Sequence, residues 1–185
     1  MRIIGGEHRG RALAAVGKGD AGAHLRPTTD RVRESLFNLI LGGRFGDPVE
    51  GARVLDLFAG TGALGLEALS RGAAQVTFVD DGRVAQGLIR KNIAVLGVEG
   101  ATRLMRCSAL RLPPCEGEGA GLVFLDPPYG KDLGAKALSA ALAQGWIAEG
   151  ALVVWEESGA VVPPEGLTLL ESRKYGDTMI TLLER

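Results

Sequence analysis

The sequence lacks several features that define whole classes of proteins. Cysteine occurs only at Cys107 and Cys115, without the Cys-x-x-Cys spacing of metal and redox sites. The two histidines, His8 and His24, have no neighbouring metal ligands in the chain. No apolar run approaches membrane-spanning length, and Met1–Ile4 runs at once into glycine and charge, unlike a signal peptide. We therefore expect a cytoplasmic protein without disulfide, metal or membrane segment.

What is present is the composition of one folded α/β domain. Apolar residues make up 46% of the 185 residues, which argues against disorder and suits a single domain with a substantial core. From residue 53 onward, strand patterns alternate with helical patterns, which predicts right-handed crossovers and a mostly parallel, doubly wound sheet. The predicted strands are 53–58, 75–80, 102–107, 121–126 and 150–156, the predicted helices are 62–72, 83–96 and 132–145, and 167–174 pairs with 178–184 in a closing hairpin.

The N-terminal part of the chain differs from the rest in charge. Within residues 1–44 there are eight basic residues against four acids, although the whole chain has a net charge of −1. We divide the chain into a basic arm over 1–25, with a short hairpin over 2–16, and a larger domain over 26–185 whose first helix follows Pro27. The predicted apolar face of that helix consists of Val32, Leu36, Leu39 and Ile40. A basic arm on an acidic body is typical of phosphate recognition, although chance clustering on a solvated surface is the alternative. The candidate RNA contacts are Arg2, Arg9, Arg11 and Arg26.

A tetrapeptide at residues 126–129 is the first chemical signal. Asp126, Pro127, Pro128 and Tyr129 follow the apolar run 121–125, so they lie at the carboxyl end of a buried strand, where α/β sheets bind ligands. The prolines stiffen the turn and leave carbonyls free to accept hydrogen bonds, and the tyrosine offers a flat face for a nucleobase. Acceptors beside an aromatic ring suit the exocyclic amino group of a planar base. An ordinary strand-ending turn with a half-buried tyrosine remains the alternative at this point.

A glycine turn follows the first predicted strand. Gly60, Gly62 and Gly65 satisfy the G-x-G-x-x-G spacing, and Asp80 ends the next strand at a distance that suits a ribose partner. Read literally, this is a dinucleotide fingerprint. Asp56 argues against that reading, because a carboxylate beside the turn repels a pyrophosphate and attracts a cation such as the ammonium of a methionine moiety. S-adenosylmethionine is therefore the favoured cofactor.

Together the two motifs resemble the amino-methyltransferases, and the chain as a whole resembles the bacterial ribosomal RNA small-subunit methyltransferase D family. The resemblance covers almost the whole chain, through the runs 2–6, 9–11, 25–38, 56–73 and 174–178. It implies a Rossmann-like class I S-adenosylmethionine-dependent methyltransferase with a mostly parallel seven-stranded sheet, an antiparallel C-terminal hairpin and a short N-terminal β-hairpin. It also implies methylation of the exocyclic N2 of a guanine in 16S ribosomal RNA.

The proposed chemistry uses the tetrapeptide directly. Asp126 and the Pro127 carbonyl accept hydrogen bonds from the amino group, while Tyr129 stacks on a guanine turned out of its helix. The resemblance places the cofactor near a further set of residues, and Ser108 departs from the acid or amide usual there, so the backbone of Ala109 could replace its contact. Thr28 matches the segment near the methionine end, although helix capping explains it equally well. The cofactor-binding candidates are Asp56, Phe58, Ala59, Gly60, Thr61, Gly62, Asp80, Ser108, Ala109, Thr28 and Arg31.

Three other functions stay open on the residues alone. Asp-Pro-Pro-Tyr does not distinguish guanine N2 from adenine N6 or cytosine N4, so another RNA or a DNA amino-methyltransferase is the nearest rival, although no insert is large enough for a DNA target-recognition domain. A dinucleotide oxidoreductase and a non-catalytic RNA-binding protein are the others. The sequence does not identify the guanine. We expect a monomer that acts on RNA within a partly assembled subunit.

Overall fold

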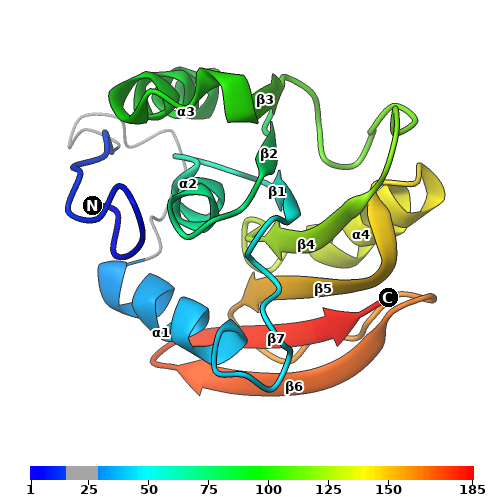
Figure 1. Cartoon of the computed structure of the whole chain (residues 1–185). Helices are drawn as coiled ribbons and strands as arrows, with labels where there is room; N and C mark the ends of the chain where they lie inside the picture. Colours follow the sequence, from blue (N-terminus) through cyan, green and yellow to red (C-terminus); the bar gives the residue numbers. More distant parts are fainter. Residues whose placement is uncertain (16–28) are drawn as a thin grey trace.

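The computed structural model describes residues 1–15 and 29–185, and within these residues it forms a seven-stranded mixed sheet with helices on both faces (Figure 1). The strand order is β3-β2-β1-β4-β5-β7-β6, in which β1 to β5 are parallel and β7 runs antiparallel between β5 and β6. This confirms the predicted sheet and its closing hairpin. The strands are β1 Arg53–Leu57, β2 Gln75–Val79, β3 Thr102–Met105, β4 Ala120–Leu125, β5 Ile147–Glu157, β6 Thr168–Tyr175 and β7 Thr178–Glu184.

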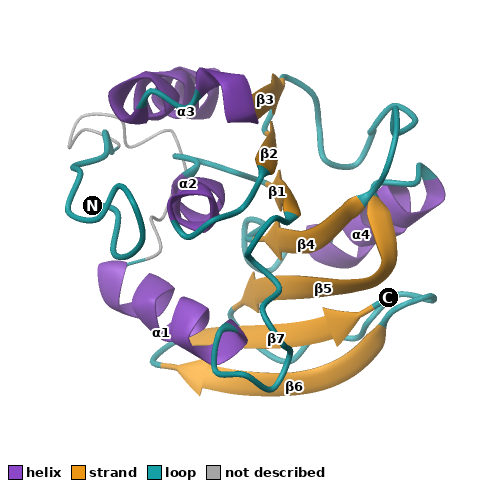
Figure 2. Ribbon diagram, in the orientation of Figure 1, coloured by secondary structure: helices purple, strands orange, loops and turns teal. Residues whose placement is uncertain are grey.

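The described helices cover the two faces of the sheet unequally. Helices α1 (Asp30–Ile40), α2 (Ala63–Ser70) and α3 (Arg83–Leu96) lie on one side, and α4 (Leu133–Ala143) lies on the other (Figure 2). Successive strand residues point to opposite faces of the sheet and form two separate cores. Phe78 and Phe124 pack with the three helices, while Leu57 and Leu125 pack with α4. Burial on both faces explains why the parallel strands are almost continuously apolar.

Local sequence signals account for where several elements begin and end. Thr29 caps α1 by accepting a hydrogen bond from the Val32 amide over 3.3 Å, and Gly97 ends α3 in the left-handed conformation. The face of α1 that packs on the sheet differs slightly from the predicted one. It buries Arg33 and Phe37 together with Leu36 and Ile40, whereas the predicted Val32 and Leu39 are only partly buried.

Most boundaries agree with the predictions within two residues, and β5 is the main exception. Residues 150–156 were predicted, but the strand extends over Ile147–Glu157, because its early residues also pair with Ala120 after a register shift. Among the described residues, the predicted hairpin over 2–16 is present as one antiparallel bridge between Arg2 and Ala12. The boundary at residue 25 lies outside the described residues. No described helix is long and apolar enough to span a membrane.

The N-terminal hairpin is packed into the domain. Ile3 and Leu13 are buried in the same core as α1, α2 and α3. The hairpin also lies close to α2. Gly6 has a φ of +74°, and any Cβ there would lie 1.6 Å from the Ser70 carbonyl oxygen. The backbone of Glu7 donates to that same carbonyl over 2.7 Å. Glycine is therefore required at position 6 for this contact.

Candidate functional site

The predicted site residues meet at the carboxyl edge of the parallel strands. The backbone amide of Ala59, just after β1, donates to the Val79 carbonyl at the end of β2 over 3.2 Å. On the other side of β1, the Asp126 amide after β4 donates to the Leu57 carbonyl over 3.5 Å. The glycine turn thus lies between the acid at the end of β2 and the tetrapeptide at the end of β4, at the position where open α/β sheets bind ligands.

The glycine turn has the backbone geometry that its sequence predicts. Gly60 and Gly62 have φ values of 58° and 76°, in the left-handed region that favours glycine. Phe58 shares this conformation with a φ of 57°, which is strained for a residue with a side chain. At Gly65 in the first turn of α2, a Cβ would lie 2.5 Å from the Phe78 ring, so this glycine allows the helix to approach the sheet. The backbone of the turn therefore lies close to the strands, where it can approach a ligand at the carboxyl edge of the sheet.

Asp80 is fixed beside this turn by two backbone donors. Its Oδ2 accepts from the Gly60 amide over 2.9 Å and its Oδ1 from the Gly82 amide over 2.8 Å. Burial raises the pKa of this carboxyl, the two amides act to lower it, and the neighbouring Asp81 raises it further. Both oxygens keep lone pairs for further donors, which suits the hydroxyl groups of a ribose.

Asp56 lies deeper, beneath the start of α2. Only 2% of its surface is exposed, and its Oδ2 accepts from the Gly65 amide over 3.0 Å. Burial raises its pKa to about 8, with the Gly65 hydrogen bond acting against this and Asp80 adding to it. The carboxyl group therefore joins β1 to the first turn of α2, directly after the glycine turn. With Asp80 and Asp81 close by, the turn is an acidic environment that fits a cationic ligand better than a pyrophosphate.

The tetrapeptide forms the other half of the site. Asp126 and Tyr129 are half-buried, Pro127 is buried and Pro128 is exposed. The Tyr129 hydroxyl donates to Glu156 Oε1 over 3.2 Å, and Thr178 Oγ1 lies 3.5 Å away. Burial is the main cause that raises the pKa of Tyr129 to about 12, so the hydroxyl stays protonated. The site thus presents a carboxylate and a neutral aromatic ring on one stiff turn.

The weaker cofactor candidates have different outcomes. Ser108 Oγ accepts from the Leu110 amide over 3.3 Å, so this hydroxyl supports its own turn, and Ala109 is buried beside it. Arg31 is exposed on the first turn of α1. Thr28 and Arg26 lie outside the described residues. Their predicted roles stay predictions.

The basic hairpin lies next to the cofactor turn. Thr61, between the two left-handed glycines, contacts Met1 with a distance of 3.6 Å between Oγ1 and the sulfur atom. Arg9 and Arg11 are exposed, and Arg2 is exposed while it forms an ion pair with Asp30 at 3.7 Å. Met1 thus lies beside the cofactor turn, whereas Glu7 at the tip of the hairpin bonds to Ser70 at the opposite end of α2.

Two buried polar residues that were not among the predicted site residues anchor this hairpin. Glu67 on α2 is fully buried and accepts from the Ile4 and Gly5 amides, each over 2.8 Å. Asn92 on α3 is also fully buried and bonds to both backbone groups of Ala14. The sequence contains a signal for both residues. Each lies among apolar residues at helical spacing, and a polar side chain on such a buried face needs hydrogen-bond partners.

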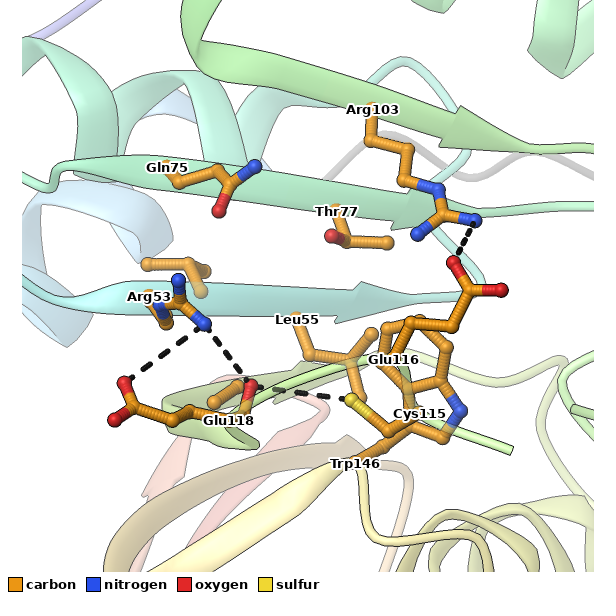
Figure 3. Close-up of a pocket in the computed structure, with 11 residues that line it drawn as sticks. Arg53, Leu55, Gln75, Thr77, Arg103, Cys115, Glu116, Glu118 and Trp146 are labelled. Carbon is orange, nitrogen blue, oxygen red and sulfur yellow. Dashed lines mark hydrogen bonds and ion pairs between the residues drawn. The ribbon is translucent and has the colours of Figure 1, made fainter. Parts of the chain in front are cut away.

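One hollow in the described structure lies away from this site. It encloses about 200 Å³ on the α4 side of the sheet, at the amino ends of the strands (Figure 3). Its arginines already have acidic partners, because Arg53 faces Glu118 at 3.9 Å and Arg103 faces Glu116 at 4.0 Å. Trp146 at its wall is buried. The hollow is therefore nearly neutral and does not belong to the site.

Comparison with known proteins agrees with this geometry. Residues 1–184 match the family described as Conserved hypothetical protein 95. The chain is 37% identical to "Ribosomal RNA small subunit methyltransferase D" of Escherichia coli, over 100% of this chain and 90% of the relative. It is 34% identical to the protein of the same name from Haemophilus influenzae, over 95% of this chain and 89% of that one. The solved structure of yhhF from Escherichia coli superposes with a TM-score of 0.82 at 37% identity, over 100% of this chain and 97% of that chain.

The sheet order and the arrangement of the glycine turn beside the tetrapeptide define a Rossmann-like class I methyltransferase. Within that class, the chain belongs to the ribosomal RNA small subunit methyltransferase D family. The predicted family and fold are confirmed. Within residues 1–15 and 29–185 no three metal-ligating side chains gather into a candidate metal site.

Proposed function

We propose that this protein transfers a methyl group from S-adenosylmethionine to the exocyclic N2 of one guanine in 16S ribosomal RNA. Membership of the family and the juxtaposition of Asp126 with the glycine turn support this. The observation that carries the proposal is the backbone hydrogen bond between Asp126 and Leu57, since it joins the predicted catalytic turn to the cofactor-binding end of β1. Adenine N6 and cytosine N4 remain the alternative targets.

The cofactor would lie along the glycine turn. Asp80 would accept hydrogen bonds from its ribose. The acidic side chains of Asp80 and Asp81 favour its ammonium and sulfonium charges over the phosphates of a dinucleotide, and Asp56, whose pKa is raised to about 8, would become charged as the cation binds. When bound, S-adenosylmethionine supplies a methyl group made electrophilic by the positive sulfur. No described contact of the turn offers a basic side chain to a phosphate, which disfavours the oxidoreductase alternative.

The residues of the tetrapeptide would prepare the amino group. The lone pair of guanine N2 is delocalised into the ring, so the nitrogen is a poor nucleophile. The Asp126 carboxylate and the Pro127 carbonyl would accept its two hydrogens and direct the lone pair toward the methyl group. Transfer of the methyl group would form the nitrogen–carbon bond at the expense of the carbon–sulfur bond and leave the nitrogen positive, and Asp126 or water would accept its proton. Positioning and electrostatics would supply most of the acceleration.

The exposed arginines of the hairpin would hold the RNA backbone. Arg2, Arg9 and Arg11 are exposed on the hairpin and would neutralise phosphates, while the target base is turned out of its stack toward Tyr129. A loop of RNA lowers the cost of that extrusion. We propose a monomeric enzyme that acts in the cytoplasm on a partly assembled small subunit; efficient methylation of protein-free RNA would contradict that substrate.

The test uses methyl-labelled S-adenosylmethionine and small subunits from a strain that lacks its own copy of this enzyme. Digestion of the RNA to nucleosides should place the label in N2-methylguanosine at one site. Label in another nucleoside would overturn the guanine assignment, and label in DNA would overturn the RNA assignment. The Asp126→Ala variant should lose about 100-fold or more in turnover while it keeps cofactor and RNA binding. Nearly intact activity in this variant would contradict the mechanism.

A further inference from the structure

The hydroxyl of Tyr129 reaches two strands that the sequence analysis did not connect with the site. It donates to Glu156 on β5 over 3.2 Å and lies 3.5 Å from the hydroxyl of Thr178 on β7. The turn that bears Tyr129 is therefore held in two ways. Its backbone continues from β4, and the hydroxyl group at the end of the tyrosine ring contacts β5 and β7.

Both anchors are held by strand pairing. Glu156 lies in β5, where its neighbour Trp155 is in register with Leu125, so Glu156 is level with Asp126 on the adjoining strand. It also pairs with Ile180 on β7, and only 5% of its surface is exposed. Thr178 opens β7 directly after the hairpin turn. Neither residue lies in a loop, so their positions are fixed by the fold.

Three features stabilise the hydrogen bond from Tyr129 to Glu156. Because its pKa is raised to about 12, the tyrosine keeps its proton at neutral pH and remains a donor. Hydrogen bonds to a carboxylate are roughly twice as strong as those between neutral groups. The two prolines stiffen the backbone before the tyrosine, but they leave its Cα–Cβ bond free to rotate. The bond at the hydroxyl removes that freedom.

We propose that Glu156 and Thr178 are positioning residues that hold the Tyr129 ring in the orientation in which it stacks on the target guanine. This inference rests on the proposed function. The closing β6–β7 hairpin then contributes to the site, because it contains Thr178 and its strand β7 pairs with β5.

The test is a double-mutant cycle in the methylation assay with small subunits. Tyr129→Phe keeps the ring and removes its hydroxyl, and Glu156→Leu removes the acceptor at similar volume. Each should lower kcat about tenfold and leave the Kd for S-adenosylmethionine unchanged. The double variant should be no slower than either single variant, because both remove the same bond. Glu156→Gln, which keeps an acceptor oxygen, should recover part of the rate.

Two further variants complete the design. Glu157→Gln, at the next position of the same strand, is the matched control and should methylate at the wild-type rate. If Glu156→Leu does not fold, the cycle is run with Glu156→Gln, and non-additivity with Tyr129→Phe is still required. Thr178→Val should give a smaller loss of kcat than Tyr129→Phe, because its contact is longer.

The outcomes separate this inference from the proposed function. If the wild-type protein places no label in guanine, the proposed function fails and this inference fails with it. If the wild type methylates guanine but Tyr129→Phe is equally fast, or the losses at Tyr129 and Glu156 multiply to about 100-fold, only the positioning role is overturned.

Discussion

The side-chain amide of Asn92 donates a hydrogen bond to the carbonyl of Thr61 over 2.9 Å. Helix α3 thus holds the glycine turn at its centre from within the protein. The same side chain accepts from the Ala14 amide over 2.7 Å and donates to the Ala14 carbonyl over 3.1 Å. One fully buried residue therefore joins the cofactor turn to the N-terminal hairpin, two parts of the proposed site that are distant in sequence.

Replacing Asn92 by alanine should weaken cofactor binding without removing any group proposed to contact the cofactor. The change leaves the Thr61 carbonyl and the Ala14 amide without their partner, at about 1–3 kcal/mol for each buried group. We expect a lower free energy of unfolding, measured with denaturant, and a higher Kd for S-adenosylmethionine by calorimetry. Lys91→Ala, an exposed neighbour on the same helix, is the control. Unchanged affinity in Asn92→Ala would contradict its role in positioning the turn.

Replacing Glu67 by glutamine should destabilise the protein strongly. Glu67 lies 3.9 Å from the buried guanidinium of Arg33 and 2.8 Å from that of Arg71, measured from their Nε atoms. Loss of its charge removes an acidic partner of the buried Arg33 guanidinium, which keeps its ion pair with Asp30 at 3.0 Å, and breaking a buried pair typically costs up to about 3–5 kcal/mol. Denaturant unfolding measures the loss, and Glu34→Gln on the exposed side of α1 is the control. A loss below about 1 kcal/mol would show that the charge of Glu67 contributes little.

Asp56 should make the stability of the ligand-free protein depend on pH. Its pKa is raised from 3.8 to about 8, so the unfolded chain releases this proton at lower pH than the folded protein. Its contribution to stability is therefore complete below about pH 4 and is lost as the pH rises toward 8. Asp56→Asn should gain stability relative to wild type across this window, as measured by denaturant unfolding at several pH values. A constant difference between the two proteins would contradict the raised pKa.

Cofactor binding offers a second test at the same residue. A cation placed beside Asp56 would lower its pKa again, so binding of S-adenosylmethionine at pH 7 should release a proton. Calorimetry in buffers of different ionisation enthalpy measures this release, and Asp56→Asn should abolish it. If wild type releases no proton and Asp56→Asn binds with unchanged affinity, the role of Asp56 is limited to its hydrogen bond with Gly65.

The exposed arginines of the hairpin should control the salt dependence of RNA binding. Arg9→Ala and Arg11→Ala should each raise the Kd for the RNA and reduce the slope of log Kd against log salt concentration by about 0.7–0.9. The reason is that each arginine that neutralises a phosphate releases a counterion. Arg53→Ala, at the opposite end of the strands, should leave the slope unchanged. Equal effects from all three variants would contradict a role specific to the hairpin.

Much of the fold could be predicted because its signals are local. Short apolar runs that alternate along the chain with helical patterns identified the strands, and the Gly60–Gly62 turn marked the start of a helix. Most element boundaries were predicted within two residues. The extension of β5 to Ile147 could not be predicted, because it depends on pairing with Ala120 across a register shift. The buried face of α1 was also misjudged, since Arg33 counts as a surface residue until its partners on other elements are known.

The sequence by itself determined the class of the protein, because the Asp126–Tyr129 turn and the glycine turn are short segments whose chemistry depends on neighbouring residues. Tertiary structure alone decided which distant residues support them. Glu67 accepted hydrogen bonds from the backbone amides of Ile4 and Gly5, more than 60 positions away, and Asn92 joined Ala14 to Thr61. Glu156 met Tyr129 because β5 pairs with β4, and Thr178 met it because β7 pairs with β5. Such long-range pairings are set by packing of the whole sheet, which no local pattern encodes.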